Sequence, residues 1–424
     1  MDQPTTWDLI HSCTYGTLDS ISGKIAVTLV FAVLQRINAS MNIRYSAKHA
    51  ITSLLGFALL VYWDLKINVI ICFVCTASLI ACTVTRLCSR YKFTGSLISI
   101  LSFVVLIALE MTLPSDQFGY RGMLMIFAMK LSSLSIDMSE GIFTATRTEI
   151  LGYFLNPATL MFGPAHPFSV YKDSLTPKST REHFWELITY SSIALLATFC
   201  LLVSACFTQL MYPFSGILRR YADAQSFRFS HYFICYWSQA LAGMSGQMTP
   251  LIVDLTQIEF PRSLTQVVSV WNAPMHQYLF RYVYNRVRGF GSGISILATF
   301  AASSLFHGLN GQLSAVLLSL GLLSWGELRL RRRLSLTLSA CVRARRCPVP
   351  CTTHSHSSSS LLALSINASF ALLAIYNLIY LGMPWNEDGQ EIGYPLSHTL
   401  SVWREHYFAS HLIALLYVAF SSAL

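Results

Sequence analysis

The apolar residues of this 424-residue chain gather in long tracts, which short polar loops separate. A tract of about 20 apolar residues is what an α-helix needs to cross a bilayer. The pattern predicts these spans: Gly23–Gln35, His49–Trp63, Ile67–Val84, Thr94–Met111, Arg121–Met138, Ile150–Phe162, Phe184–Leu210, His231–Met244, Leu264–Tyr284, Ile294–Trp325, Leu361–Met383 and Tyr407–Leu424. Several tracts are shorter than a full span, so we expect some of them to be re-entrant or interfacial.

Basic residues gather in four of the polar loops, and the positive-inside rule places such loops in the cytosol. The four groups are Arg36, Arg44 and Lys48; Arg86, Arg90 and Lys92; Arg219, Arg220 and Arg228; and Arg329, Arg331, Arg332, Arg333, Arg343, Arg345 and Arg346. Three tracts separate the third group from the fourth, where parity requires an even number. One of the three is therefore re-entrant, or the run Ile294–Trp325, about 48 Å long as one helix, turns back on itself.

This count gives about eleven crossings, a lumenal N-terminus and a cytosolic C-terminus. Two acidic groups then fall on the lumenal side. They are Asp2, Asp8 and Asp19 near the start of the chain and Glu387, Asp388 and Glu391 near its end.

Composition excludes a water-soluble protein, because only 12% of the residues are charged while 54% are hydrophobic. Soluble domains carry about 25% charged residues. We therefore predict an all-α, polytopic integral membrane protein with a single membrane domain over residues 1–424 and a cytosolic Arg/Cys/Ser-rich loop over residues 327–360. The net charge of +9 comes from the basic loops, so no nucleic acid is expected as a partner. The eleven cysteines are not interpreted as a disulfide framework, and those in or beside apolar tracts are interpreted as small buried hydrophobic residues: Cys72, Cys75, Cys82, Cys200, Cys206 and Cys235.

His307 lies in the string Ser303-Ser304-Leu305-Phe306-His307-Gly308, inside the longest apolar tract. An ionisable side chain at membrane depth is costly and is rare unless it lines a cavity or takes part in chemistry. One interpretation is a structural histidine that bonds a neighbouring helix. The other is a general base, because burial lowers the pKa of a histidine and keeps it able to accept a proton.

Asn272 lies in the string Trp271-Asn272-Ala273-Pro274-Met275. A proline soon after an asparagine is typical of a helix start, so Asn272 is interpreted as an N-cap. The same side chain is also a candidate for ligand binding, since a capping residue is rigid. The stretch after Pro274 has helical apolar spacing and predicts an amphipathic helix at the membrane surface.

Cys347 and Cys351 flank a Pro-Val-Pro string, and His354 and His356 follow them. These are residue types that bind zinc, but the spacing differs from that of common zinc motifs, and we predict no metal site. Cysteines beside a basic, membrane-proximal loop are candidates for lipidation instead.

Asn272 and His307, about 35 residues apart, give the chain a resemblance to the membrane-bound O-acyltransferase family. Further strings are similar to one branch of that family, the protein-serine O-acyltransferases that act on Wnt proteins. These strings are Pro261–Met275, Ser303–Gly308, Cys347–Cys351, Phe227–Tyr236, Ala128–Asp137 and Gly152–Pro164. The resemblance runs over residues 45–424, and the first 45 residues add nothing to it.

The resemblance implies about eleven transmembrane helices with re-entrant segments around a central cavity, in the membrane of the endoplasmic reticulum. It implies palmitoleoyl-CoA as acyl donor, a Wnt serine as acceptor, and membrane lipid around the protein, with no permanently bound cofactor. His307 would be the general base, and Asn272 would position the acyl carbonyl or the acceptor. Candidates for substrate binding are Trp271, Ser303, Ser304, Arg286 and Arg288, the two arginines for the phosphates of CoA.

Two alternatives remain open. The chain could act on another protein acceptor or on a lipid, as other members of such a family do. It could also be a polytopic transporter in which His307 belongs to a proton or solute path. Transporters often contain related halves, and this sequence shows no internal repeat.

Overall fold

The computed structural model describes residues 5–63, 67–88, 90–112, 121–211, 215–348, 350–385 and 394–424. Within these ranges the regular elements are helices, apart from one isolated bridge between Ala340 and His356. The acidic residues Asp2, Glu387, Asp388 and Glu391, which we predicted to be lumenal, lie outside the described ranges.

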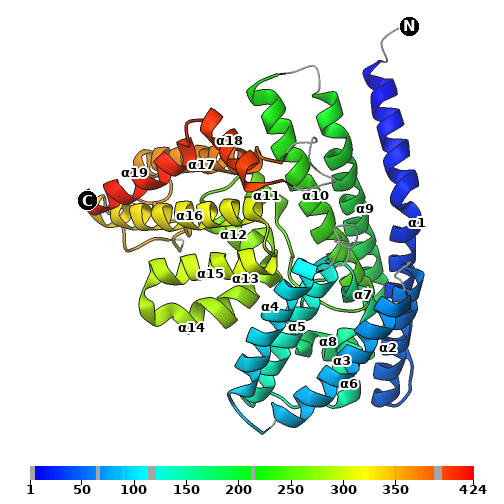
Figure 1. Ribbon diagram of the computed structural model, residues 1–424. Coiled ribbons are helices and arrows are strands. Elements are labelled where there is room, and N and C mark those ends of the chain that lie inside the picture. Colours follow the sequence, from blue (N-terminus) through cyan, green and yellow to red (C-terminus); the bar gives the residue numbers. More distant parts are fainter. Residues whose placement is uncertain are drawn as a thin grey trace. The chain divides into compact units, whose positions relative to one another are not determined.

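The helices, labelled as in Figure 1, follow one another along the chain, and a long connection separates α16 from α17. They are α1 (Thr6–Ser40), α2 (Tyr45–Tyr62), α3 (Ile67–Leu87), α4 (Thr94–Thr112), α5 (Arg121–Ser139), α6 (Arg147–Phe154), α7 (Pro157–Leu160), α8 (Phe168–Ser174), α9 (Thr180–Leu210), α10 (Ile217–Met244), α11 (Leu255–Glu259), α12 (Leu264–Trp271), α13 (Ala273–Leu279), the π-helix η2 (Phe280–Tyr284), α14 (Asn285–Val287), the 3₁₀ helix η3 (Arg288–Phe290), α15 (Ser292–Phe306), α16 (Gly311–Thr337), α17 (Leu361–Gly382), α18 (Leu396–Glu405) and α19 (Ala409–Ala423).

Five of the described helices are long and apolar enough to cross a membrane. They span Thr6–Ser40, Arg121–Ser139, Arg181–Leu210, Gly311–Thr337 and Leu361–Gly382. The protein is thus a polytopic helical membrane protein, as its composition predicted. The count of about eleven crossings stays a prediction.

The chain divides into two compact units, where we expected a single domain. The first comprises residues 1–206 and 230–252, and the second comprises residues 207–229 and 253–424.

In the first unit, buried polar contacts join helices far apart in the sequence. Arg36, only 5% exposed, donates to the carbonyl oxygens of Gly243 and Met244, both at 2.6 Å, and pairs with Glu186 at 2.7 Å. Lys48 is also buried and donates to backbone carbonyls. These two residues are therefore helix-packing groups, although we predicted them to be charges of a cytosolic loop.

A disulfide between Cys13 in α1 and Cys206 in α9 joins segments 193 residues apart. The interpretation of Cys206 as a buried hydrophobic residue was wrong. Its partner Cys13 lies before the first predicted span, and no pattern in the sequence links two cysteines so far apart.

In the second unit, the long apolar run around His307 is interrupted, which is one of the two alternatives that the parity of the loops left open. Helix α15 ends at Phe306 and α16 begins at Gly311. Ser304 Oγ donates to Ser314 Oγ at 2.6 Å, and at the other end a Cβ on Gly293 would lie 3.0 Å from Trp325 Nε1. The two helices thus form an antiparallel hairpin, and Figure 1 shows them side by side.

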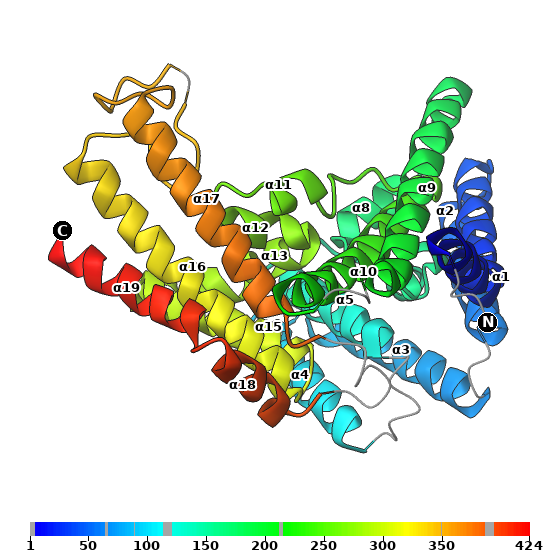
Figure 2. The same ribbon diagram turned by 90° about the horizontal axis from the view of Figure 1, so that it is seen from above.

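Helix α16 continues to Thr337, so Glu327, Arg329, Arg331, Arg332 and Arg333 are helical. The connection to α17 begins at Leu338 and not at residue 327, where we predicted the loop to start. Side chains of α12, α16, α17, α18 and α19 form one apolar core, and Figure 2 shows α16, α17 and α19 side by side. Its buried members are Leu264, Val316, Leu323, Leu330, Phe370, Ala374, Tyr380, Leu381, Trp403, Ala414 and Tyr417.

Candidate functional site

His307 lies at the turn of the hairpin between α15 and α16. It is the C-cap residue of α15, and its N–H donates to Ser303 O at 3.2 Å. Gly308 follows with a φ of 84°, a conformation that glycine adopts without the steric cost of a Cβ. Asn310 then caps α16 by accepting from the N–H of Leu313 at 3.0 Å. Both sides of the turn are therefore anchored, and they hold the half-buried side chain of His307 at the tip of the hairpin.

Ser303 and Ser304 occupy the last turn of α15 and are buried. Ser303 is four residues before His307, which places the two on one face of the helix. Ser304 closes the hairpin through its bond to Ser314. Ser303 thus shares a helix face with His307, while Ser304 joins α15 to α16, and the substrate-binding role of both stays a prediction.

Asn272 separates α12 from α13, and its Oδ1 accepts from the N–H of Met275 at 3.1 Å. The predicted N-cap is confirmed. Capping uses the oxygen of the side-chain amide, which leaves its NH₂ group to donate in another direction. The capping and ligand-binding interpretations of Asn272 are therefore compatible.

Asn272 and the His307 turn lie at the same end of the second unit. The segment from α13 to η3 runs antiparallel to α15, because the ring of Tyr278 contacts Phe306 at 5.3 Å and Ser295 Oγ donates to Val287 O at 3.0 Å. From Tyr278, α13 extends back toward Asn272 by about 9 Å. This carries Asn272 past the end of α15, to the level of the His307 turn.

Aromatic stacking supports the same placement. The ring of Phe227 stacks on Trp385 at 4.1 Å and on Trp271 at 6.4 Å. Gln312, in the first turn of α16, donates to the carbonyl oxygen of Pro384 at 3.1 Å. Trp271, through Phe227, and the start of α16, through Gln312, therefore both pack near the same short segment, which contains Pro384 and Trp385.

Arg286 and Arg288 lie elsewhere. Both are exposed, in α14 and η3, beside the start of α15. The 15 residues of α15, about 22 Å of helix, separate that end from His307. A ligand that contacted these arginines and His307 together would extend along the whole of α15.

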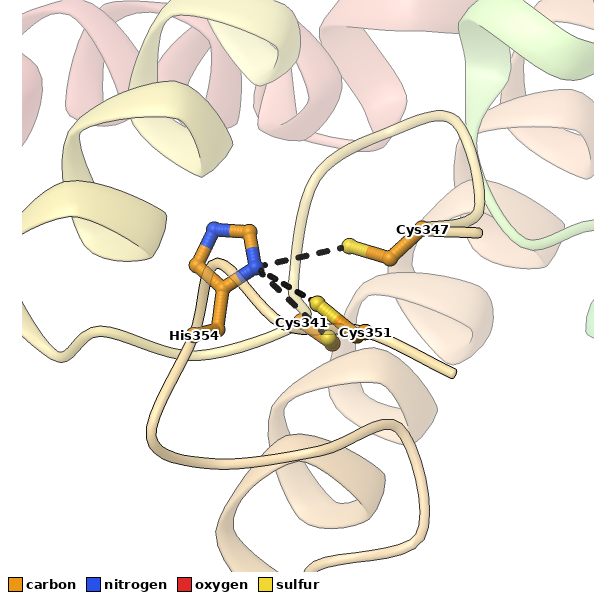
Figure 3. A group of neighbouring side chains, drawn as sticks. All are labelled: Cys341, Cys347, Cys351 and His354. Atoms are coloured by element: carbon orange, nitrogen blue, oxygen red, sulfur yellow. Dashed lines mark hydrogen bonds between the residues drawn. The ribbon is translucent and has the colours of Figure 1, made fainter. Parts of the chain in front are cut away.

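Cys347 and Cys351 are brought together with Cys341 and His354, and Figure 3 shows the four side chains pointing toward one another. Their ligand atoms all lie within 4.8 Å of one another. His354 was among the residues considered for zinc, but Cys341 was not, because it lies six residues before the Cys-Pro-Val-Pro-Cys string. The presence of three cysteines and a histidine within 14 residues could have indicated this cluster from the sequence.

A buried ionic network, which we did not predict, connects this region to α12. Glu327 and Arg331 in α16 are 1% and 0% exposed and pair at 3.4 Å. Glu327 also accepts from the N–H of Leu264 at 2.8 Å, and Arg331 donates to Arg262 O at 3.0 Å and to Asn367 Oδ1 at 2.7 Å. An acid and a base four residues apart in an apolar helix are the pattern that could have revealed it.

His276 in α13 is partly buried. Burial, and in the same direction the positive charge of Arg345, lowers its pKa below the usual value. Burial thus favours the neutral form of this histidine. The influence of Arg345 also indicates that the connection between α16 and α17 lies near α13.

A cavity of about 400 Å³ lies between α16, α17 and α19, away from His307. Its lining is almost entirely apolar, and the predicted site residues do not contribute to it. The candidate site is therefore defined by the His307 turn and Asn272, and not by this cavity.

Known proteins similar to this chain agree with the family resemblance that its motifs indicate. The family model described as "MBOAT, membrane-bound O-acyltransferase family" matches residues 253–349, a segment that contains both Asn272 and His307. A human protein named "Protein-serine O-palmitoleoyltransferase porcupine" is 32% identical over 446 residues, which cover 96% of this chain and 95% of that protein.

Relatives with the same name occur in invertebrates. The Caenorhabditis briggsae protein is 31% identical over 353 residues (80% of this chain, 79% of that protein), and the Drosophila melanogaster protein is 33% identical over 338 residues (71% and 63%). The similarity to the human protein covers more than residues 45–424, the range that the motifs alone indicated.

Proposed function

The chain belongs to the porcupine protein-serine O-palmitoleoyltransferases of the membrane-bound O-acyltransferase family, and we propose that His307 and Asn272 carry its reaction. The protein is an acyltransferase that moves a monounsaturated acyl group from acyl-CoA to a serine of Wnt proteins. The observation that supports the assignment of residues is the antiparallel packing of the segment from α13 to η3 against α15, from which we infer that Asn272 lies at the level of the His307 turn.

His307 acts as the general base. A neutral imidazole nitrogen takes the proton from the serine hydroxyl as the serine oxygen attacks the thioester carbonyl of the donor. The new C–O bond forms, the C–S bond breaks, and the departing CoA thiolate receives the proton that His307 carried. The anchored turn supports this role, because the backbone on both sides of His307 is fixed by the end of α15 and by the Asn310 cap of α16.

Asn272 positions the acyl group. Its NH₂ group donates to the carbonyl oxygen, where negative charge develops as the serine attacks. Trp271 and Ser303 lie next to the two residues and contact the substrate. Arg286 and Arg288 bind the phosphates of palmitoleoyl-CoA, which then lies extended along α15.

The protein is a multi-pass membrane protein, and we place it in the endoplasmic reticulum with a lumenal N-terminus and a cytosolic C-terminus. The disulfide of Cys13 supports this orientation, since disulfides persist in oxidising compartments and are rare in the cytosol. The acceptor serine then reaches His307 from the lumen, and the acyl-CoA donor reaches it from the cytosol.

The test is acyl transfer in membranes from cells that express the full chain. Labelled palmitoleoyl-CoA and a Wnt serine-loop peptide are added, and label on the peptide is measured. His307→Ala is expected to lower the rate by about 10²–10⁴-fold, the usual contribution of a general base. His406→Ala is the matched control, because His406 is likewise a half-buried C-cap, at the end of α18.

If the His307→Ala variant transferred label at the wild-type rate and at an equal protein level, His307 would not be the general base. Absence of transfer by the folded wild type would instead favour a transporter, and transfer only to a different protein or to a lipid would favour another acceptor.

A further inference from the structure

We propose that Cys341, Cys347, Cys351 and His354 form a structural zinc site in the connection between α16 and α17. The proposal is independent of acyl transfer, since these residues lie at the opposite end of α16 from His307. It reverses our prediction that the chain binds no metal.

The distances fit a tetrahedral ion. Nδ1 of His354 lies 3.2 Å from Cys351 Sγ and 3.7 Å from both Cys341 Sγ and Cys347 Sγ. Zinc bonds of about 2.3 Å to sulfur and 2.0–2.1 Å to nitrogen, at a tetrahedral angle, separate S and N by about 3.6 Å. The four side chains therefore surround a space of the right size for one zinc ion (Figure 3).

Hydrogen bonds alone do not account for this arrangement. Besides the three sulfur atoms, Thr353 Oγ1 lies 3.2 Å from the same Nδ1. A neutral imidazole nitrogen without hydrogen has one lone pair and accepts one good hydrogen bond. A cation at the centre explains why three thiol groups converge there, while Thr353 Oγ1, 3.5 Å from Cys351 Sγ, is placed to donate to that sulfur.

The tautomer of His354 leaves the lone pair of Nδ1 available to bind a metal. Ser335 Oγ donates its only hydrogen to Ala340 O at 2.9 Å, so toward His354 Nε2, 3.0 Å away, it acts as acceptor. Nε2 therefore carries the hydrogen, and the lone pair lies on Nδ1, which faces the sulfurs. Such a second partner for a metal-binding histidine is a general feature of metal sites.

The backbone of the connection is already closed around the site. The N–H of Cys341 donates to His356 O at 3.0 Å and the N–H of His356 donates to Ser339 O at 2.9 Å, so the two ends of the loop pair. Pro348 and Pro350 restrict the segment between Cys347 and Cys351. Three thiolates and one zinc leave a charge of −1, which the neighbouring Arg262 balances; it donates to Cys341 O at 3.1 Å.

Zinc is favoured because thiolate and imidazole are its preferred ligands and because four protein ligands leave no open position. The site is therefore closed and structural, not catalytic. Its role would be to fix the loop whose carbonyl oxygens bind Arg262, two residues before α12 and ten before Asn272.

The experiment measures metal in the full-length protein purified in detergent without chelator. Elemental analysis is expected to find about one zinc per chain. Cys347→Ser, Cys351→Ser and His354→Ala should each lose most of it, whereas Cys82→Ser, a free and partly exposed cysteine of the first unit, should keep it. His354→Cys should also keep the metal, because four cysteines form an equally good site.

Two further measurements separate a metal site from misfolding and from lipidation. Replacing zinc by Co²⁺ should give the sulfur-to-cobalt charge-transfer band and the visible bands of a tetrahedral site. Ser335→Ala should weaken zinc binding by about 10–100-fold without abolishing it. The proposal is overturned if the monodisperse wild type contains no stoichiometric metal, or if mass spectrometry finds Cys347 or Cys351 acylated or joined in a disulfide.

Discussion

Single residues divide into those whose role the sequence reveals and those whose role depends on partners from elsewhere in the chain. His307 and Asn272 stood out because each breaks an apolar or helical pattern, and the structure places both at helix ends. Cys206, Arg36 and Lys48 carry no such mark. Their partners lie on other helices, and only folding brings them together.

The two functions of Asn272 can be separated by one substitution. Asn272→Asp keeps an oxygen for the N–H of Met275 and so keeps the N-cap, but it removes the NH₂ donor. We expect thermal stability near that of the wild type and a loss of acyl transfer of about 10²-fold or more, as for other donors to a developing oxyanion. Asn272→Ala should lose activity and, in addition, about 1 kcal/mol of stability. Full activity of Asn272→Asp would show that the residue is only a cap.

At the scale of helices, the sequence predicted the positions of apolar helices better than it predicted the boundaries of the loops between them. The break in the run Ile294–Trp325 was one of the two alternatives that counting basic loops left open, although Arg331, one of the residues counted, is buried in α16. The count still held because α16 ends in exposed basic residues, Arg332 and Arg333. The pairing of α15 with α16 could not be derived, since it depends on contacts such as Ser304 with Ser314.

The hairpin turn depends on Gly308. Its φ of 84° is unfavourable for a residue with a Cβ, at a cost of about 1–2 kcal/mol. Gly308→Ala is therefore expected to lower thermal stability and to reduce acyl transfer by displacing His307. Gly289→Ala is the control, because no atom lies within 4 Å of the added Cβ and its φ is not positive. Equal melting temperatures for the two variants would contradict the assigned role of the turn.

The ion pair of Glu327 and Arg331 gives a prediction about helix packing. Removing one partner of a buried pair costs about 3–5 kcal/mol, because the other charge is left without compensation. Glu327→Ala should therefore unfold at a markedly lower temperature in detergent. Glu327→Gln should lose less, since its amide oxygen can still accept from Leu264 N–H. Arg332→Ala, an exposed position on the same helix, serves as the control; a loss there as large as in Glu327→Ala would exclude a specific effect of the pair.

For the whole molecule, one marker in each unit supports the orientation in the membrane that we propose. Cys13 and Cys206 form a disulfide, and disulfides persist in oxidising compartments, which favours a lumenal position for the end of the first unit that holds them. In the second unit, Arg329 donates to Ser422 Oγ at 3.2 Å, and the C-terminus therefore lies at the basic end of α16. The positive-inside rule assigns that end to the cytosol, where a reduced cysteine cluster is also stable.

In sealed microsomes, a tag at the N-terminus should consequently resist added protease, and a tag at the C-terminus should be digested. The disulfide provides an independent check, because Cys13→Ser and Cys206→Ser should each change the mobility of the chain on a non-reducing gel but not on a reducing one. Digestion of the N-terminal tag in intact vesicles would overturn the orientation. It would also leave the disulfide on the reducing side of the membrane, where its 193-residue link between α1 and α9 would not persist.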